Sequence, residues 1–131
     1  MIRAVVDTNV FVSGLINPSG NPAKVINMFL NGEVILLYDV RILEEYRNVL
    51  KRDKFGFGEE LINPLLDYIE SSGESVVAGG VNNKFRDEDD RKFYEVAKSG
   101  GADYLITGNK AHFPKDGIVV NPTEFLNGLL F

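Results

Sequence analysis

Residues 5–15 read VVDTNVFVSGL, an apolar run interrupted by a single acidic residue, Asp7. The apolar segment 2–6 before it predicts a buried strand that ends at this acid. A carboxylate between two apolar runs is strongly disfavoured without a partner, and burial raises its pKa. A metal ion is the partner that would also explain several other acids of the chain.

The rest of the chain alternates short apolar segments with amphipathic ones. Further strands are expected at 34–37, 76–78, 104–107 and 118–120. Helices are expected from residue 22 to about 30, after the cap Asp39 as far as about 50, at about 59–71, from about 89 to 100, and after the cap Asn121. Segment 11–16 continues apolar without a decided element. This alternation indicates an α/β layer fold with a mainly parallel sheet. We expect a single domain over 1–131, because no repeat, low-complexity tract or linker interrupts the pattern.

Composition excludes several kinds of chemistry. The 131 residues contain no cysteine and one histidine, His112, which rules out thiolate zinc sites, disulfide scaffolds and multi-histidine metal sites. The first residues lack a signal-peptide pattern and no apolar run approaches a membrane span, so we expect a cytoplasmic protein without a membrane partner. A net charge of −5 argues mildly against a sequence-independent nucleic-acid binder. What remains is mostly carboxylate chemistry.

Ligands of open parallel sheets bind beyond the carboxyl ends of the strands. Two sets of polar residues follow predicted strands: Asp7, Thr8 and Asn9, and Thr107, Gly108 and Asn109. Glu45 lies on the inner half of its predicted helix, and Asp90 lies one turn before Phe93. A fold that gathers these elements would place three carboxylates in one cleft.

Each of these residues also has a purely structural interpretation. Helix N-termini favour acids, so capping alone can explain any one of Asp87, Glu88, Asp89 and Asp90. Glu45 alone fits a solvated helix acid, and Asn109 fits a turn. Asp7 is the hardest to explain without a ligand.

Four blocks together resemble a known family: VVDTNVFVSGL (5–15), LEEYRNVL (43–50), RDEDDRKFYEVAKSGGADYLITGNKAHFP (86–114) and VVNPTEFL (119–126). In order and spacing they are similar to PIN domains of bacterial and archaeal toxin–antitoxin systems, relatives of the VapC-like toxins, from residue 2 to about 130. The resemblance implies a three-layer α/β/α sandwich and a metal-dependent ribonuclease that leaves a 5′-phosphate and a 3′-hydroxyl. It also implies an antitoxin partner and a homodimer.

The resemblance assigns roles to particular positions. Asp7, Glu45 and Asp90 match the family's first three acids, and the fourth, usually Asp, is Asn109 here. We expect Asp7 and Asp90 to anchor a Mg²⁺ or Mn²⁺ ion, with Glu45 as a further ligand or as the group that orients the attacking water. A second ion near Asn109 would be held weakly or only together with substrate, because an amide oxygen carries no charge.

Further residues would support this site. Asp87 is a candidate outer acid, and Thr8, Asn9 and Thr107 are candidates for positioning water or phosphate. Because clustered carboxylates repel one another, Mn²⁺ is expected to raise the melting temperature. An RNA substrate would need cations, and the candidates are Arg47, Lys51, Arg52, Lys54, Arg86, Arg91, Lys92 and Lys110. The segment 112–114, His-Phe-Pro, either stacks on a base or packs its own loop.

Two other functions compete with the nuclease. A haloacid-dehalogenase-type phosphotransferase needs a second Asp two residues after the first, where this chain has Asn9, so the sequence disfavours it. A PIN fold with weakened catalysis, serving as an RNA- or protein-binding module, is the alternative. Asn109 favours that module, whereas Asp7, Glu45 and Asp90 favour the enzyme.

Overall fold

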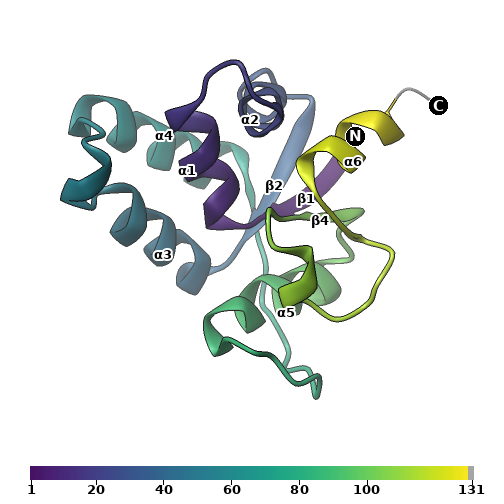
Figure 1. Cartoon of the computed structure of the whole chain (residues 1–131). Coiled ribbons are helices and arrows are strands. Elements are labelled where there is room, and N and C mark those ends of the chain that lie inside the picture. The colour runs from purple at the N-terminus through teal and green to yellow at the C-terminus, as the bar shows by residue number, and fades with distance from the viewer. Residues whose placement is uncertain (130–131) are drawn as a thin grey trace.

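A parallel sheet forms the centre of the computed structural model, which describes residues 1–129 (Figure 1). The strands are β1 (Ile2–Val6), β2 (Val34–Tyr38), β3 (Glu74–Ser75), β4 (Tyr104–Ile106) and β5 (Val119–Val120). They pair in the order β3-β2-β1-β4-β5, and every pairing is parallel. Ala4, Val5 and Val6 of the central strand are all buried, as expected for a sheet covered on both faces.

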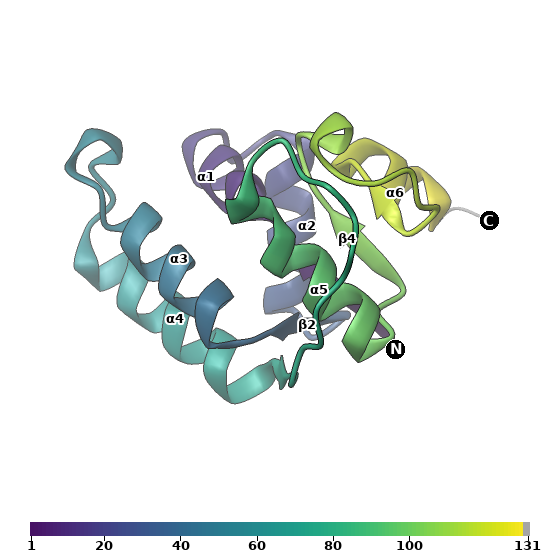
Figure 2. The same ribbon diagram turned by 90° about the horizontal axis from the view of Figure 1, so that it is seen from below.

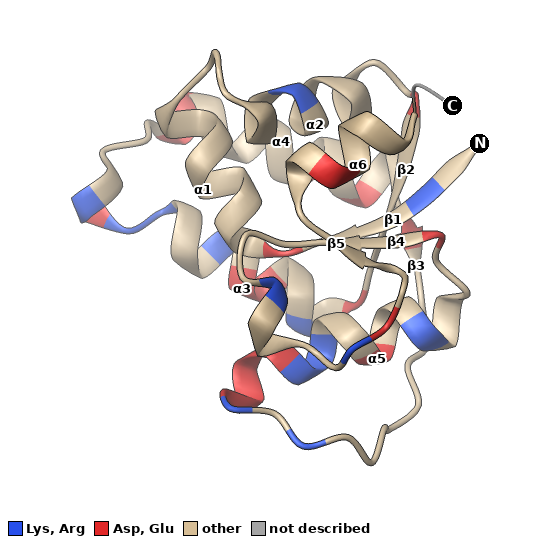
Figure 3. Cartoon of the chain, turned by 45° about the vertical axis from the view of Figure 1, so that its right-hand side comes forward, with Lys and Arg blue, Asp and Glu red and all other residues tan. Residues whose placement is uncertain are grey.

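Helices cover both faces of this sheet. They are α1 (Thr8–Ile16), α2 (Asn21–Leu30), α3 (Val40–Leu50), α4 (Glu59–Ser72), α5 (Arg91–Gly100) and α6 (Pro122–Gly128). Helices α1, α2, α4 and α6 lie above the sheet in Figure 3, with α5 below it. Seen from below, α5 lies on the near side of the sheet (Figure 2), where it packs against β1, β2 and β4. The predicted three-layer α/β/α fold is therefore confirmed, and α3 packs against both α4 and α5.

Short 3₁₀ turns complete the connections around the carboxyl ends of the strands. They are η1 (Asp53–Phe55), η2 (Glu88–Asp90) and η3 (Lys110–His112). Of these, η2 leads directly into α5 and η3 follows β4, so both lie near the predicted site.

The predicted capping residues define two helix starts. The Asp39 side chain accepts a hydrogen bond from the Ile42 backbone N–H at 3.0 Å and begins α3. Asn121 and Glu124 form a reciprocal capping box at α6, with bonds of 2.7 and 2.9 Å. These caps fix the starts of helices whose bodies carry only weak boundary signals.

Two segments differ from the sequence expectation. The predicted strand at 76–78 is wrong, because the paired residues are Glu74 and Ser75, opposite Leu37 and Tyr38 of β2. Val76 still donates its N–H to the Tyr38 carbonyl at 2.8 Å, after which the chain leaves the sheet. The undecided segment 11–16 forms the last two thirds of α1. Within the described residues, no helix is long and apolar enough to cross a membrane.

Candidate active site

The central strands β1 and β4 end side by side. Val6 is level with Ile106, so the next residues, Asp7 and Thr107, are neighbours. Thr107 donates its hydroxyl to Asp7 Oδ2 at 2.8 Å. Asp7 is 5% exposed and Thr107 is fully buried. Asp7, the acid that is hardest to explain without a ligand, is therefore buried at the carboxyl edge of the sheet, where it accepts a hydrogen bond from a hydroxyl group.

Asn9 ties the same two strand ends together. Its amide nitrogen donates to Asp7 Oδ2 at 3.3 Å, and its amide oxygen accepts from the Gly108 N–H at 3.1 Å. The Thr107 hydroxyl oxygen also accepts the Asn109 N–H at 3.0 Å. As placed, the polar groups of Asn9 and Thr107 hold protein atoms, so their role in positioning water or phosphate stays a prediction.

Tyr46 of α3 gathers the other two acidic elements around Asp7. Its ring is fully buried and its hydroxyl donates to the Val6 carbonyl, the last one of β1. The ring packs edge-on against Phe11 of α1, with centroids 5.0 Å apart, and lies 6.5 Å from the Phe93 ring of α5. Since Glu45 precedes Tyr46 and Asp90 lies one turn before Phe93, this aromatic cluster brings both acids to the end of β1.

Glu45 is held by two neighbours. The Thr8 hydroxyl donates to Glu45 Oε2, and the Lys92 ammonium lies 2.6 Å from Glu45 Oε1. The Lys92 side chain is 12% exposed and also donates to the Asp89 carbonyl. Lys92, expected only as an RNA-binding cation, thus neutralises one acid of the cleft.

Asp90 carries an oxygen without a hydrogen bond. Its Oδ2 is buried, and within residues 1–129 no donor reaches it with hydrogen-bond geometry. His112 Nδ1 of η3 lies 3.5 Å away, beyond the usual hydrogen-bond length. Burial raises the pKa of Asp90, and the negative charges of Asp87 and Glu45 raise it further, against the lowering effect of His112. A buried acceptor left in this state is costly.

A cleft of about 350 Å³ joins these side chains. Acidic, polar and apolar side chains line it: Asp7, Glu45, Asp87, Asp89, Asp90, Thr8, Asn9, Ser13, Val12, Val49 and Phe55. Burial raises the pKa of Asp7 to about 6, partly offset by the Thr107 hydrogen bond, and the charges of Asp90 and Glu45 raise it too. The three predicted acids therefore interact electrostatically across one cleft.

Asp87 and Asn109 have different positions relative to this cleft. Asp87 lines it while capping η2, since its side chain accepts the Asp89 N–H at 3.0 Å. Asn109 is exposed beyond β4 and is not one of the lining residues. The fourth ligand position stays a prediction. Asp89, which the sequence suggested only as a possible helix cap, also lines the cleft. So does Phe55, which the sequence did not single out, because an aromatic residue in a turn has no periodic signal.

The donor set fits a divalent cation of the magnesium type. Such ions prefer oxygen ligands, and Mg²⁺ often binds through one or two carboxylates with water completing its shell. Asp7 and Asp90 offer carboxylate oxygens, and one of these, Asp90 Oδ2, accepts no hydrogen bond. Within residues 1–129 no three acidic or histidine side chains are arranged to hold a metal together. Glu45, the third predicted acid, has its carboxylate bound to Lys92 and Thr8.

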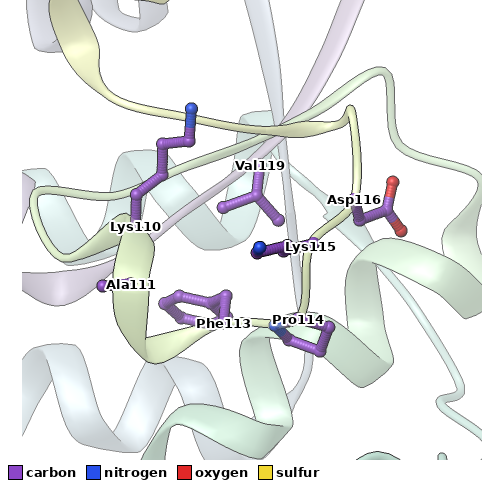
Figure 4. Close-up of a pocket in the computed structure, with 7 residues that line it drawn as sticks. All are labelled: Lys110, Ala111, Phe113, Pro114, Lys115, Asp116 and Val119. Carbon is purple, nitrogen blue, oxygen red and sulfur yellow. The ribbon is translucent and has the colours of Figure 1, made fainter.

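A second hollow of about 450 Å³ lies behind η3 (Figure 4). It is lined by Lys110, Ala111, Phe113, Pro114, Lys115, Asp116 and Val119. Its one acid, Asp116, accepts from Tyr94 at 2.8 Å and pairs with Lys98 at 3.0 Å. Phe113 is buried and meets Phe85 edge-on, which matches the loop-packing interpretation of segment 112–114. This hollow therefore offers no counterpart to the acidic cleft.

Comparison with known proteins agrees with this architecture. A family model described as PIN domain matches residues 3–111. The chain belongs to the PIN domain family. It is 34% identical over 114 residues to the uncharacterized protein MJ1680 of Methanocaldococcus jannaschii, an alignment covering 83% of this chain and 72% of that relative. No solved structure matches the chain. PIN domains are generally nucleases and typically use divalent metals.

Proposed function

We propose that this PIN domain is a metal-dependent endoribonuclease acting at the acidic cleft. The observation that carries the proposal is the buried Oδ2 of Asp90, which accepts no hydrogen bond, has only His112 Nδ1 at 3.5 Å, and lines the same cleft as Asp7. A site that keeps two partly buried acids close together, at a cost to folding, is typical of functional sites. A cation between them would relieve that cost.

The side chains divide the work as follows. Asp7 and Asp90 would hold Mg²⁺ or Mn²⁺. Thr107 and Asn9 fix the Asp7 carboxylate through the hydrogen bonds described above. Glu45 would orient the attacking water once Lys92 turns to the substrate's phosphate. A bound divalent ion supplies charge stabilisation and a more acidic water for phosphodiester hydrolysis.

Cleavage of a labelled single-stranded RNA tests this proposal. We expect the purified protein to cut the RNA with Mn²⁺ or Mg²⁺ and not with EDTA, since without the ion the carboxylates repel the phosphate and no cation stabilises the charge that develops on it. Cutting that persists in EDTA would contradict metal dependence. A folded protein that cuts in no metal would favour the binding module instead, and Asn109→Asp would then be the variant to test for recovery.

We further propose that the protein is the toxin of a toxin–antitoxin pair and forms a homodimer. The family resemblance motivates this, and an apolar groove of about 380 Å³ between α1, α2 and α4 supports a protein partner. Leu30 and Leu61 line that groove, although they are 44% and 49% exposed.

The toxin role has a simple expected result in living cells. Induced expression of the wild-type chain should stop bacterial growth, and the Asp7→Asn variant, expressed to the same level, should not. Growth should recover when the adjacent gene's product is supplied together with the wild type. Equal growth with the wild type and with Asp7→Asn would contradict a toxin.

The homodimer has a test of its own. The mass of the purified protein in solution should be twice that of one chain.

A further inference from the structure

The acidic cleft has one aromatic residue in its lining, Phe55 of η1. The ring is half-buried and stacks on Phe57, with centroids 5.5 Å apart and planes 15° from parallel. Phe57 packs against the hydrophobic core, whereas Phe55 lies outside that core as far as residues 1–129 define it. Phe57 therefore supports a ring that the core does not need.

Positive charge accompanies this ring. The Lys54 ammonium lies 5.1 Å from the Phe55 centroid. In Figure 3 the connection from α3 to α4 carries Lys and Arg together with one acid, Asp53, whereas Asp and Glu gather where η2 leads into α5. The Phe55 ring therefore has a cation beside it, outside the lining of the acidic cleft.

A second cleft of about 380 Å³ adjoins the first. The two share Glu45, Val49 and Asp89 in their linings, and Arg41, Arg52 and Lys92 supply the cations of the second. Arg41 and Lys92 are already ion-paired with acids. Arg52 has no ion pair with any residue that the structure describes. One charge is therefore available for a ligand in this groove.

The acidic side chains of the cleft repel a polyanion such as RNA. The energy that binds the RNA must therefore come from residues around the cleft. Base–aromatic stacking and a neighbouring cation supply such energy for single strands, since every base offers a flat face. A paired base in a duplex cannot present that face to the Phe55 ring.

We infer that Phe55 stacks on a base of a single-stranded RNA and that Arg52 receives an adjoining phosphate, which together position the strand across the acidic cleft. This inference rests on the proposed nuclease function and adds its substrate-positioning residues. Phe55 acts by positioning and takes no part in the chemical step.

Steady-state cleavage of a short single-stranded RNA tests the role of Phe55. Phe55→Ala should raise KM roughly 5- to 150-fold, the range that stacking on one base supplies, with kcat nearly unchanged. Phe55→Trp should keep the wild-type KM, because the larger ring still stacks. Val77→Ala is the matched control, since Val77 is 97% exposed and lines neither cleft.

Binding to RNAs with one base removed at successive positions separates stacking from a structural effect. At one position the missing base should weaken wild-type binding, and in Phe55→Ala that penalty should disappear. Arg52→Ala should weaken binding to every sequence and lower the salt slope by about one.

The outcomes are distinguishable. Equal KM values for wild type and Phe55→Ala, or the same base-removal penalty in both, would overturn the stacking role while leaving the nuclease intact. Wild type that neither binds nor cuts RNA would overturn both proposals.

Discussion

Asp7→Asn is expected to abolish RNA cleavage and to raise the free energy of unfolding of the metal-free protein by about 3 kcal/mol at neutral pH. The substitution removes a buried negative charge, because the Asp7 carboxyl, with a pKa of about 6 in the folded protein, is ionised at neutral pH. An amide oxygen can still accept the Thr107 hydroxyl, so the hydrogen bond at this site is retained. Asp7, which the proposed reaction needs, therefore lowers the stability of the metal-free protein.

The pH dependence of stability gives the sign of this effect. Below the ordinary pKa of 3.8 the Asp7 carboxyl is protonated in both states and changes nothing. Between that value and about 6 the unfolded chain loses the proton while the folded protein keeps it, so stability falls as pH rises. Above about pH 6 the carboxyl is ionised in both states, and the whole loss of stability caused by its burial remains.

Urea unfolding of wild type and Asp7→Asn in EDTA, across this pH window, measures the effect. The two stabilities should agree in acid and separate as pH rises. Asp67→Asn, an exposed acid of α4 outside both clefts, should stay within about 0.5 kcal/mol of wild type throughout. If stability changed with pH in the same way in both proteins, or if Asp7→Asn were less stable than wild type at neutral pH, the conclusion that Asp7 destabilises the protein would be wrong.

Much of the fold could be predicted because its signals are local. A buried strand before Asp7, a cap at Asp39 and the Asn121–Glu124 pair each depend on a few neighbouring residues. The third strand was misplaced because an edge strand is selected by its neighbour. Leu37 and Tyr38 pair with Glu74 and Ser75, although the valines that follow have the higher strand propensity.

The site was predictable only in part, because several of its contacts join residues that are far apart in the sequence. The sequence and its resemblance named the three acids, and these do line one cleft. The contacts of Lys92 with Glu45, and of His112 with Asp90, join separate elements, and no spacing rule predicts them.

Mn²⁺ is expected to raise the melting temperature of the wild-type protein on the order of 10 °C at a free concentration about a hundredfold above its Kd. The ion would bind the folded state and neutralise the repulsion among Asp7, Asp90 and Glu45, which raises the Asp7 pKa. Thermal unfolding with Mn²⁺, Mg²⁺ and NaCl of matched ionic strength checks this. NaCl alone should give almost no shift, because the acids are partly buried.

The Asp7→Asn variant makes the metal prediction specific. It already lacks the charge that the ion would neutralise, so its own gain in stability and the gain from Mn²⁺ should not add. We expect the variant to melt above wild type in EDTA and to shift little with Mn²⁺, whereas Asp67→Asn shifts as wild type does. An equal shift in wild type and Asp7→Asn would place the bound ion away from this cleft. No shift at millimolar Mn²⁺ would mean that the buried oxygen of Asp90 is unpartnered for a reason other than metal binding.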